Sequence, residues 1–359
     1  MYISHIKLQN FRNYKKLSLD LNPNINIFYG DNGQGKTNVI EAVFLCGMGK
    51  SFRTNKEQEL IRLEENFSEV EVEFQKKDRE GVIRIVLEKK KAIFLNGVKI
   101  KKLSDLLGKI NLVIFSPDDL EILKEGPSKR RRFLDMMIGQ LRPNYIHCLN
   151  LYLKTLEQRN NYLKQIRFES KQENMLEIWD EKLAEYAEKI VAYRIEFMQK
   201  IKEKLNTIHQ DITEEKETLE IEYHTDAKTK EEFFRLLKQN HRLDMLKGYT
   251  TKGVHRDDFT IFINGRQVNI YGSQGQNRTV VLSLKLTELK IIEEEIGEEP
   301  ILLLDDFMSE LDEKRRNRLL QVMRNTQVLI TCTDPLELRN VSSNLFKVEN
   351  GEIKNKEAF

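Results

Sequence analysis

Four residues near the N-terminus have the types and spacing of a phosphate-binding loop. The fixed positions of the pattern G-x-x-x-x-G-K-[ST] are all filled, by Gly30, Gly35, Lys36 and Thr37. The apolar run before them predicts a buried strand, and residues 38–45 predict a helix. Glycines let backbone amides point at phosphate oxygens, while Lys36 can neutralise phosphate charge and Thr37 can hold Mg²⁺. The predicted nucleotide-binding residues are Gly30, Asp31, Asn32, Gly33, Gln34, Gly35, Lys36, Thr37 and Asn38.

Two acids follow a second apolar run far downstream. Residues 300–306 read Pro-Ile-Leu-Leu-Leu-Asp-Asp, which is typical of a Walker B strand. At the carboxyl end of a buried parallel strand, Asp305 can enter the Mg²⁺ shell and Asp306 can polarise the attacking water. Together with the complete P-loop, this segment predicts ATP hydrolysis with Mg²⁺, held by Thr37 and Asp305.

A second anion-binding helix start lies between these two motifs. Residues 271–276 read Tyr-Gly-Ser-Gln-Gly-Gln and precede an amphipathic helix from about Asn277 to Ile292. A serine hydroxyl and glycine amides at a helix start can bind a phosphate. Because one ATP has a single γ phosphate, the second site is best explained if it serves ATP bound to another copy. We therefore expect Ser273 and Gly275 to act in trans in an ATP-dependent homodimer.

Charge and composition limit the possible partners. The chain has 359 residues with 59 basic and 57 acidic side chains, so binding to nucleic acid requires local basic patches. Candidate DNA contacts are Arg53 and a cluster formed by Lys129, Arg130, Arg131 and Arg132. For the cluster, internal ion pairs or a solvated face are the alternative. For Arg53, the alternative is a solvated loop residue with no contact to nucleotide or DNA.

The remaining composition favours a soluble cytoplasmic protein. The three cysteines are widely spaced, which argues against a disulfide framework or a metal site. No stretch resembles a signal peptide or approaches the roughly 20 apolar residues of a membrane span. We therefore expect no membrane association.

The pattern along the chain predicts an α/β fold with an inserted helical domain. Strands at 2–8 and 17–21 predict an antiparallel flap, and segments 69–74, 81–87 and 92–99 predict a small antiparallel sheet with an Asn96-Gly97 turn. Residues 110–115 and 328–334 predict buried strands. An apolar stripe from Leu176 to Leu205 predicts one helix of an antiparallel hairpin joined near residues 169–174, with about 24 residues spanning roughly 36 Å.

These elements predict three segments. Residues 1–119 form the N-terminal part of an ATPase lobe, residues 120–246 form a helical arm, and residues 247–359 complete the lobe with the serine-glycine signature and Walker B. The length agrees with about two domains, or one large domain with an insertion.

The order of motifs resembles the ABC-type ATPases of the SMC branch. This order is the P-loop, the serine-glycine signature, Walker B and then residues 309–312, which read Ser-Glu-Leu-Asp. A closer similarity to the RecF family of bacterial recombination mediators runs through essentially the whole chain. It is carried by residues 10–14 (Asn-Phe-Arg-Asn-Tyr), 116–120 (Ser-Pro-Asp-Asp-Leu), 126–127 (Gly-Pro), 131–135 (Arg-Arg-Phe-Leu-Asp), 253–258 (Gly-Val-His-Arg-Asp-Asp) and 273–276 (Ser-Gln-Gly-Gln).

The resemblance implies an ABC-type core and a role in recombinational repair, replication-gap processing and the SOS response. It further implies weak DNA-stimulated ATPase activity, an ATP-sandwiched dimer, and binding of duplex DNA near single-strand gaps. RecR and RecO are the implied partners in loading RecA. Carried onto this chain, Lys36, Ser273, Asp305 and Asp306 would be catalytic. Gln276 would join Ser273 and Gly275 at the nucleotide, and Asp312 would link the two sites.

Three positions depart from the wider ABC pattern. Asp306 stands in place of the usual glutamate, Thr333 in place of the switch histidine, and Ser116-Pro117 in place of a lid glutamine. These departures suggest slow hydrolysis that drives release from DNA.

Several alternatives remain open from the sequence. An ABC-type subunit of a transporter or of another chromosome machine would share the motifs. A P-loop kinase or GTPase, or a non-hydrolysing DNA-binding scaffold, is also compatible with parts of the pattern. For residues 255–257, His-Arg-Asp, structural ion pairing and contact with DNA or nucleotide are equally open.

Overall fold

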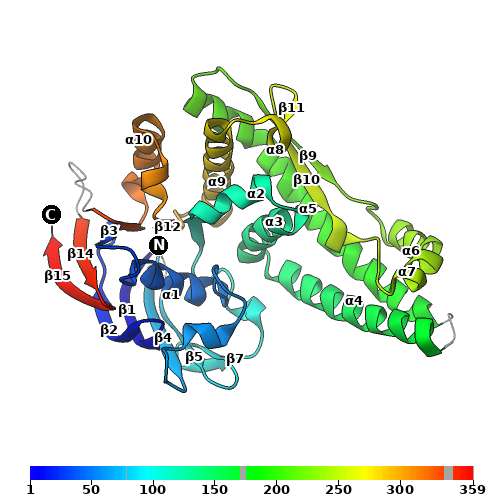
Figure 1. Cartoon of the computed structure of the whole chain (residues 1–359), viewed down its shortest axis with the longest axis horizontal. Coiled ribbons are helices and arrows are strands. Elements are labelled where there is room, and N and C mark those ends of the chain that lie inside the picture. The colour runs from blue at the N-terminus through cyan, green and yellow to red at the C-terminus, as the bar shows by residue number, and fades with distance from the viewer. Residues whose placement is uncertain (78, 170–174, 335–342, 359) are drawn as a thin grey trace. The chain divides into compact units, whose positions relative to one another are not determined.

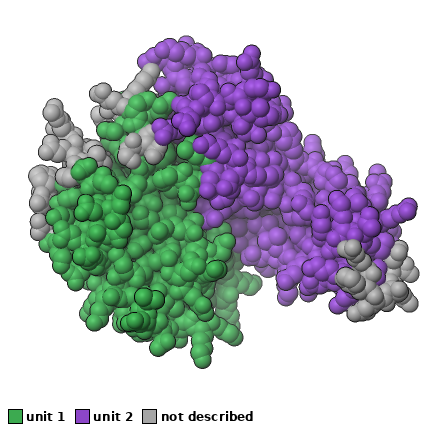
Figure 2. All heavy atoms as spheres, viewed as in Figure 1, with its two compact units in different colours: residues 1–120, 285–359 green, residues 121–284 purple. Residues whose placement is uncertain are grey.

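The computed structural model describes residues 1–77, 79–169, 175–334 and 343–358 of the chain. The chain divides into two compact units. Unit 1 comprises Met1–Leu120 with Lys285–Phe359, and unit 2 comprises Glu121–Leu284 (Figure 2). The second division therefore lies at residue 284, whereas the sequence suggested 246. The difference arises because β9 (Leu219–His224) pairs with β10 (Asp258–Ile263), which ties the segment after residue 246 to the helical unit.

The first sheet of unit 1 is antiparallel and joins the predicted flap and the predicted small sheet into one structure. They are continuous because β1 pairs with β2 on one side and with β4 on the other. Asn96 and Gly97 both have positive φ, 49° and 79°, as the predicted hairpin turn requires. In spatial order the strands are β2 (Tyr14–Asp20), β1 (Tyr2–Phe11), β4 (Ser68–Lys76), β5 (Arg79–Leu87), β6 (Ala92–Leu95) and β7 (Val98–Ile100).

The second sheet of unit 1 is mostly parallel and brings the sequence motifs to one edge. Its apolar strands are buried on both faces, which explains their continuous apolar runs. Because parallel strands end at the same edge, the P-loop after β3, the acids after β12 and the end of β13 lie next to one another. In spatial order the strands are β15 (Glu352–Ala358), β14 (Ser343–Glu349), β3 (Ile25–Tyr29), β13 (Val328–Cys332), β12 (Ile301–Asp305) and β8 (Leu112–Phe115), with only β15 antiparallel.

Helix α1 (Lys36–Met48) lies between the two sheets of unit 1, in contact with β1, β4 and β5 of one and β12 and β13 of the other (Figure 1). A helix packed on both sides must be apolar all round, and the predicted inner residues Ile40, Val43 and Phe44 are all buried. The buried carboxylate of Glu41 is paired with Arg12 at 2.7 Å. Helix α10 (Glu313–Val322) follows the Walker B acids.

Unit 2 is built on a helical hairpin and a three-stranded antiparallel sheet. Helices α4 (Pro143–Glu169) and α5 (Leu176–Thr213) pack along each other (Figure 1). The residues expected to join them, 170–174, lie outside the described residues. At 38 residues α5 is longer than the expected 24, and it would span about 57 Å. The sheet has the order β11 (Arg266–Gln267), β10 and β9. The helices are α2 (Glu121–Lys124), α3 (Pro127–Leu141), α4 (Pro143–Glu169), α5 (Leu176–Thr213), α6 (Lys230–Gln239), α7 (His241–Lys247), α8 (Val268–Tyr271) and α9 (Gln274–Ile296), which continues into unit 1.

A fully buried arginine on α4 ties the hairpin to α7. The guanidinium of Arg159 lies 2.7 Å from Asp180 of α5 and 2.7 Å from Asp244 of α7, and it also donates to the hydroxyl of Thr250. Buried ion pairs are stable only when their remaining hydrogen-bonding groups are largely satisfied. Asp244 meets this condition by accepting from the Thr251 amide and hydroxyl.

His255 and Asp257 each have partners inside unit 2. Arg194 of α5 donates to Asp257 at 2.8 Å, and the Tyr223 hydroxyl donates to the same carboxylate at 2.5 Å. His255 lies between the Tyr152 hydroxyl, 2.7 Å from Nδ1, and the Thr250 carbonyl, 3.1 Å from Nε2. Both residues thus belong to the internal network of unit 2, which favours structural pairing over contact with DNA or nucleotide.

No helix among the described residues combines the length and apolar character needed to cross a bilayer.

Candidate nucleotide site

The P-loop has a backbone shape that only glycine adopts easily. Gly30, Gly33 and Gly35 have φ of 142°, 80° and 112°. A Cβ on Gly30 would lie 2.5 Å from the carbonyl oxygen of Val348, and one on Gly35 would lie 2.4 Å from the Asn13 side chain. Such contacts are far too short. The two glycines at the ends of the motif are therefore required by both conformation and space.

Lys36 is held over the loop it belongs to. Its Nζ donates to the carbonyl oxygens of Gly30 at 2.6 Å and Asp31 at 3.1 Å, and the side chain is buried. The Gly30 amide in turn donates to the Thr333 carbonyl at 3.2 Å, which attaches the loop to the end of β13. An ammonium in this position faces the space where loop amides bind phosphate.

Thr37 and Asp305 meet although 268 residues separate them. The Thr37 hydroxyl donates to Asp305 Oδ1 at 2.7 Å. Burial raises the pKa of Asp305, whereas the hydroxyls of Thr37 and Thr331 oppose this rise. A hydroxyl and a carboxylate side by side match the oxygen ligands that Mg²⁺ prefers. No group of three or more His, Cys, Asp or Glu residues suited to a metal occurs in the described part of the chain.

Thr331 is a site residue that sequence reasoning did not assign. Its hydroxyl donates to Asp305 Oδ1 at 2.9 Å and accepts from the Asp306 amide at 2.9 Å. Thr331 lies opposite Asp305 in the pairing of β13 with β12. A polar residue at the end of a strand parallel to Walker B was the available signal, but using it requires knowing that these strands are neighbours.

Asp306 faces a pocket next to the P-loop. It has a left-handed backbone, with φ of 49°, and lines a cavity of about 330 Å³ together with Asn32 and Thr333. The predicted water-polarising acid and the residue in the switch-histidine position thus share one pocket with the P-loop. The Thr333 hydroxyl donates to Asp334 at 3.2 Å.

Arg53 lies near the start of α1, the helix that follows the P-loop. Its Nη1 donates to Asn38 Oδ1 at 2.9 Å and pairs with the buried Glu41 carboxylate at 3.4 Å, and its side chain is 42% exposed. A groove of about 930 Å³ runs beside it, lined also by Arg12, Arg62 and Gly33. Arg53 therefore combines proximity to the loop with a partly accessible charge.

Two turns brace the outside of the P-loop, and their role was not predicted. Asn13, between β1 and β2, donates to the Gln34 carbonyl at 2.7 Å, and the neighbouring Tyr14 hydroxyl donates to the Gly35 carbonyl at 3.1 Å. From the turn between β14 and β15, the Gly351 amide also donates to the Gln34 carbonyl, at 3.0 Å. The Asn350 amide donates to Gln34 Oε1 at 2.7 Å. The loop is thus fixed by hydrogen bonds from both ends of the chain.

Ser273 is the N-cap of α9. Its hydroxyl accepts from the Gln276 amide at 3.2 Å, and its own amide donates to Gln276 Oε1 at 2.9 Å. This reciprocal pair is a capping box. Ser273 is exposed, so the serine predicted to act in trans is accessible at a helix start. Ser273, Gly275 and Gln276 belong to unit 2, whereas the P-loop belongs to unit 1.

Asp312 caps the helix that follows Walker B. Its carboxylate accepts from the Arg315 amide at 2.9 Å and pairs with the Arg315 guanidinium at 2.6 Å. Asp312, which is predicted to link the two nucleotide sites, thus also stabilises the start of α10.

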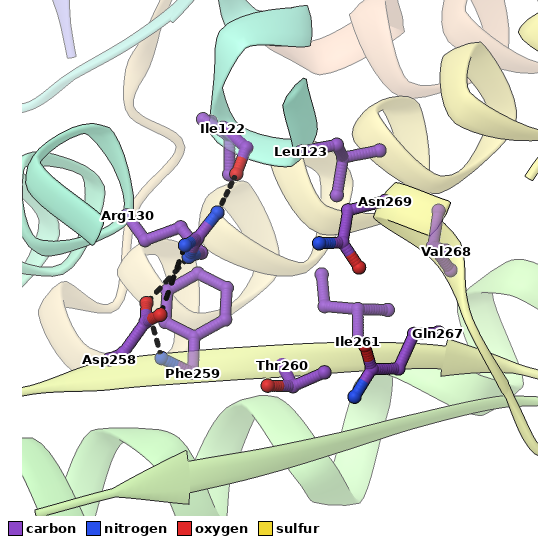
Figure 3. Close-up of a pocket in the computed structure, with 10 residues that line it drawn as sticks. All are labelled: Ile122, Leu123, Arg130, Asp258, Phe259, Thr260, Ile261, Gln267, Val268 and Asn269. Atoms are coloured by element: carbon purple, nitrogen blue, oxygen red, sulfur yellow. Dashed lines mark hydrogen bonds and ion pairs between the residues drawn. The ribbon is translucent and has the colours of Figure 1, made fainter. Parts of the chain in front are cut away.

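Three members of the basic cluster have internal partners. Lys129 pairs with Glu121 of α2, and Arg131 donates to the Asp257 carbonyl at 2.9 Å. Arg130 reaches across a small pocket of about 70 Å³ to Asp258 and to the Ile122 carbonyl (Figure 3). Acids of α2 and β10 thus compensate the positive charge at the start of α3. These contacts favour the internal-ion-pair alternative over DNA contact for Lys129, Arg130 and Arg131.

Comparison with known proteins agrees with this geometry. The family described as RecF/RecN/SMC N-terminal domain matches residues 2–355. A protein named DNA replication and repair protein RecF from Clostridium perfringens strain 13 is 44% identical over 363 residues, covering 99% of this chain and 100% of its own. One of the same name from Acetivibrio thermocellus is 44% identical, covering 98% and 99%. This chain belongs to the RecF family.

Solved structures extend the comparison to the fold. The recombination mediator RecF in complex with ATP superposes with a TM-score of 0.93 at 40% identity, covering 99% of this chain and 98% of that one. An SMC head domain from Pyrococcus furiosus superposes with a TM-score of 0.58 at 17% identity, over 100% and 96%, which shows the fold alone. The predicted RecF resemblance and the ABC-type α/β fold class are confirmed. The chain is thus an ATPase of a DNA replication and repair family, which disfavours a transporter subunit, kinase or GTPase.

Proposed function

We propose that this chain is a slow, DNA-stimulated ATPase that pairs with a second copy on binding MgATP. The dimer would bind duplex DNA near single-strand gaps and, with RecR and RecO, would help to load RecA during recombinational repair. The observation that carries the proposal is the junction of the two nucleotide motifs, where Thr37 lies 2.7 Å from Asp305 beside Lys36. The RecF relatives' names and the ATP complex of RecF support the same reading.

Each residue of the site has a distinct task in this proposal. The P-loop amides and Lys36 bind and neutralise the β and γ phosphates. Thr37 and Asp305 would hold Mg²⁺, which would neutralise charge on the phosphate oxygens. Asp306 would orient the attacking water, and its backbone is fixed for this purpose by the Thr331 hydroxyl, 2.9 Å from its amide.

Slow hydrolysis follows from the two substitutions that share the pocket next to the loop. Asp306 is one methylene shorter than the usual glutamate, so its carboxylate reaches less far toward the water. Thr333 brings a neutral hydroxyl where a histidine would contact the γ phosphate. Both changes remove transition-state contacts, and losing one such contact commonly lowers kcat by about 10²-fold or more. ATP binding would then persist long enough to time the release from DNA.

The trans role of Ser273 rests on its accessibility. Its side chain is exposed at the start of α9, where it forms the capping box with Gln276. Helix starts bind anions through free amides and the helix dipole. Arg53 remains our candidate for contact with DNA or nucleotide because its charge is partly exposed beside the P-loop.

Sedimentation velocity with different nucleotides tests the proposal. We expect a monomer without nucleotide and with ADP, and a dimer with ATP or a slowly hydrolysed analogue, more populated when duplex DNA is present. Asp306→Asn should retain ATP binding and accumulate the ATP dimer, whereas Lys36→Ala should remain monomeric. A wild-type protein that stays monomeric with saturating ATP and DNA would refute the proposed dimer. An Asp306→Asn variant that behaves like wild type would favour a non-hydrolysing scaffold.

A further inference from the structure

A chain of polar contacts connects Ser273 to the long arm helix α5, and all of its members lie in unit 2. Gln276 is held at both ends of its amide. Its Oε1 accepts from the Ser273 amide at 2.9 Å, and its Nε2 donates to Glu217 Oε1 at 2.9 Å. Glu217 therefore fixes the side chain that completes the capping box.

Glu217 follows the carboxyl end of α5 and faces that helix with its other oxygen. Glu217 Oε2 lies 3.3 Å from Nε2 of His209, a fully buried residue of α5. On the opposite side of the ring, His209 Nδ1 lies 2.9 Å from the hydroxyl of Ser283 on α9. The end of α5 thus meets α9 at two places, one through Glu217 and Gln276 and the other through His209 and Ser283.

Hydrogen-bond directions at the second place are fixed by the local donors. The Ser283 hydroxyl donates its only proton to the Thr279 carbonyl at 2.8 Å. His209 Nδ1 must therefore carry a proton and donate to Ser283. Nε2 makes no hydrogen bond to the described residues, so its 3.3 Å contact with Glu217 Oε2 is an ion pair only while His209 is protonated. Burial lowers the pKa of His209, and the Glu217 carboxylate opposes the change.

These hydrogen bonds differ in their exposure to water, so a substitution will weaken some of them more than others. Ser273 is exposed, so water competes with its bonds to Gln276. Glu217 is only 21% exposed and accepts a charge-assisted bond. The Glu217 bond is accordingly the stronger restraint on Gln276, and through Gln276 on the geometry of the Ser273 amide and hydroxyl.

We infer that Glu217 and Gln276 are positioning residues that couple the arm helix α5 to the signature serine. This inference rests on the proposed trans role of Ser273. Movement of α5 would shift Glu217, release Gln276 and loosen the α9 start that must close over the partner's ATP. The arm thereby acts on nucleotide-dependent pairing while the P-loop in unit 1 keeps its own geometry.

The test compares ATP-dependent dimerisation of Glu217→Ala, Glu217→Gln and the matched control Glu220→Ala, which changes an exposed glutamate on β9. With the full chain, a slowly hydrolysed ATP analogue and Mg²⁺, Glu217→Ala should raise the dimer dissociation constant about tenfold, as expected for one lost charge-assisted bond. Its affinity for a fluorescent ATP analogue should stay within about twofold of wild type. Glu217→Gln keeps an acceptor oxygen for Gln276 and should recover most of the loss, and Glu220→Ala should match wild type.

Several results would overturn the inference. Wild-type dimerisation of Glu217→Ala would do so, as would a Glu217→Gln variant no better than Glu217→Ala, since the hydrogen bond would then not matter. An equal loss of ATP-analogue affinity would indicate a general structural defect. Gln276→Leu provides a second variant and should weaken dimerisation at least as much as Glu217→Ala, because Gln276 is also a predicted nucleotide contact. Ser273→Ala distinguishes failure of the proposed trans role from failure of the coupling. If Ser273→Ala dimerises normally, the trans role of Ser273 is refuted. If Ser273→Ala is impaired and Glu217→Ala dimerises normally, only the coupling through Glu217 is refuted.

Discussion

Replacing Thr331 by valine removes one hydroxyl from the centre of the proposed Mg²⁺ site and keeps the side-chain shape. That hydroxyl donates to Asp305 at 2.9 Å and accepts from the Asp306 amide at 2.9 Å, and Thr331 is fully buried. A hydrogen bond to a charged group contributes about 1.5–3 kcal/mol, and a neutral one about 1 kcal/mol. We expect Thr331→Val to lower the free energy of unfolding by about 2.5–4 kcal/mol, or the Tm by roughly 3–5 °C for a chain of 359 residues.

Urea denaturation and calorimetry of Thr331→Val and Thr333→Val provide the assay. Thr333 is two residues further along the chain, and its exposed hydroxyl donates to Asp334 at 3.2 Å. Its removal should change stability by less than about 0.5 kcal/mol. Because Asp305 also loses a donor that favours its ionised form, Thr331→Val should in addition weaken Mg²⁺-dependent ATP binding.

Equal stability of the two valine variants would refute this reasoning. It would mean that the Thr331 hydroxyl contributes no more than a surface group, and that the arrangement of Asp305 and Asp306 does not depend on β13. A stable Thr331→Val protein with unchanged Mg²⁺ dependence would further show that Asp305 is positioned by Thr37 alone.

Three further variants probe other parts of the molecule. Burial lowers the pKa of His255 to about 4, against about 6.5 in the unfolded chain. The contribution of His255 to the free energy of unfolding should therefore be complete above pH 6.5 and fall by up to about 3 kcal/mol as the pH decreases toward 4. His255→Gln should show a weaker pH dependence of stability in urea denaturation. Arg159→Met should cost about 3–5 kcal/mol in urea denaturation, because it removes the guanidinium from two buried carboxylates, Asp180 and Asp244. Lys189→Met, at an exposed position of α5, should be nearly neutral. Gly30→Ala should abolish ATP-analogue binding in a fluorescence titration, since its Cβ would lie 2.5 Å from the Val348 carbonyl; preserved binding would contradict the proposed rigidity of the loop.

The parts of the site that sequence reasoning reached are those encoded in contiguous residues. A strand, a glycine loop and a helix occur together between Ile25 and Met48, and their local pattern is sufficient to predict them. Walker B is likewise an apolar run with two acids at its end. The capping box of Ser273 and Gln276 also spans only four residues, although the sequence pattern predicts an anion site there and not a cap.

The remaining parts depend on which strands become neighbours. Thr331 reaches Asp305 only because β13 lies beside β12, and Asn350 reaches Gln34 across 316 residues because β14 lies beside β3. The ion-pair partner of Arg130 could not be predicted from the sequence either, since Asp258 lies 128 residues away on β10. Periodicity predicts that these strands exist, but their order in the sheet is set by tertiary packing.

The most direct test of the account is a mixing experiment with Lys36→Ala and Ser273→Ala proteins. Each variant alone should show neither ATP-dependent dimers nor ATPase activity, because one lacks the P-loop lysine and the other lacks the signature serine. If the serine acts on the partner's nucleotide, a mixed dimer contains one complete site, and mixing should restore dimers and part of the activity. If mixing restores neither, while both variants remain folded and Ser273→Ala still binds ATP, the two halves of the site do not come from different copies.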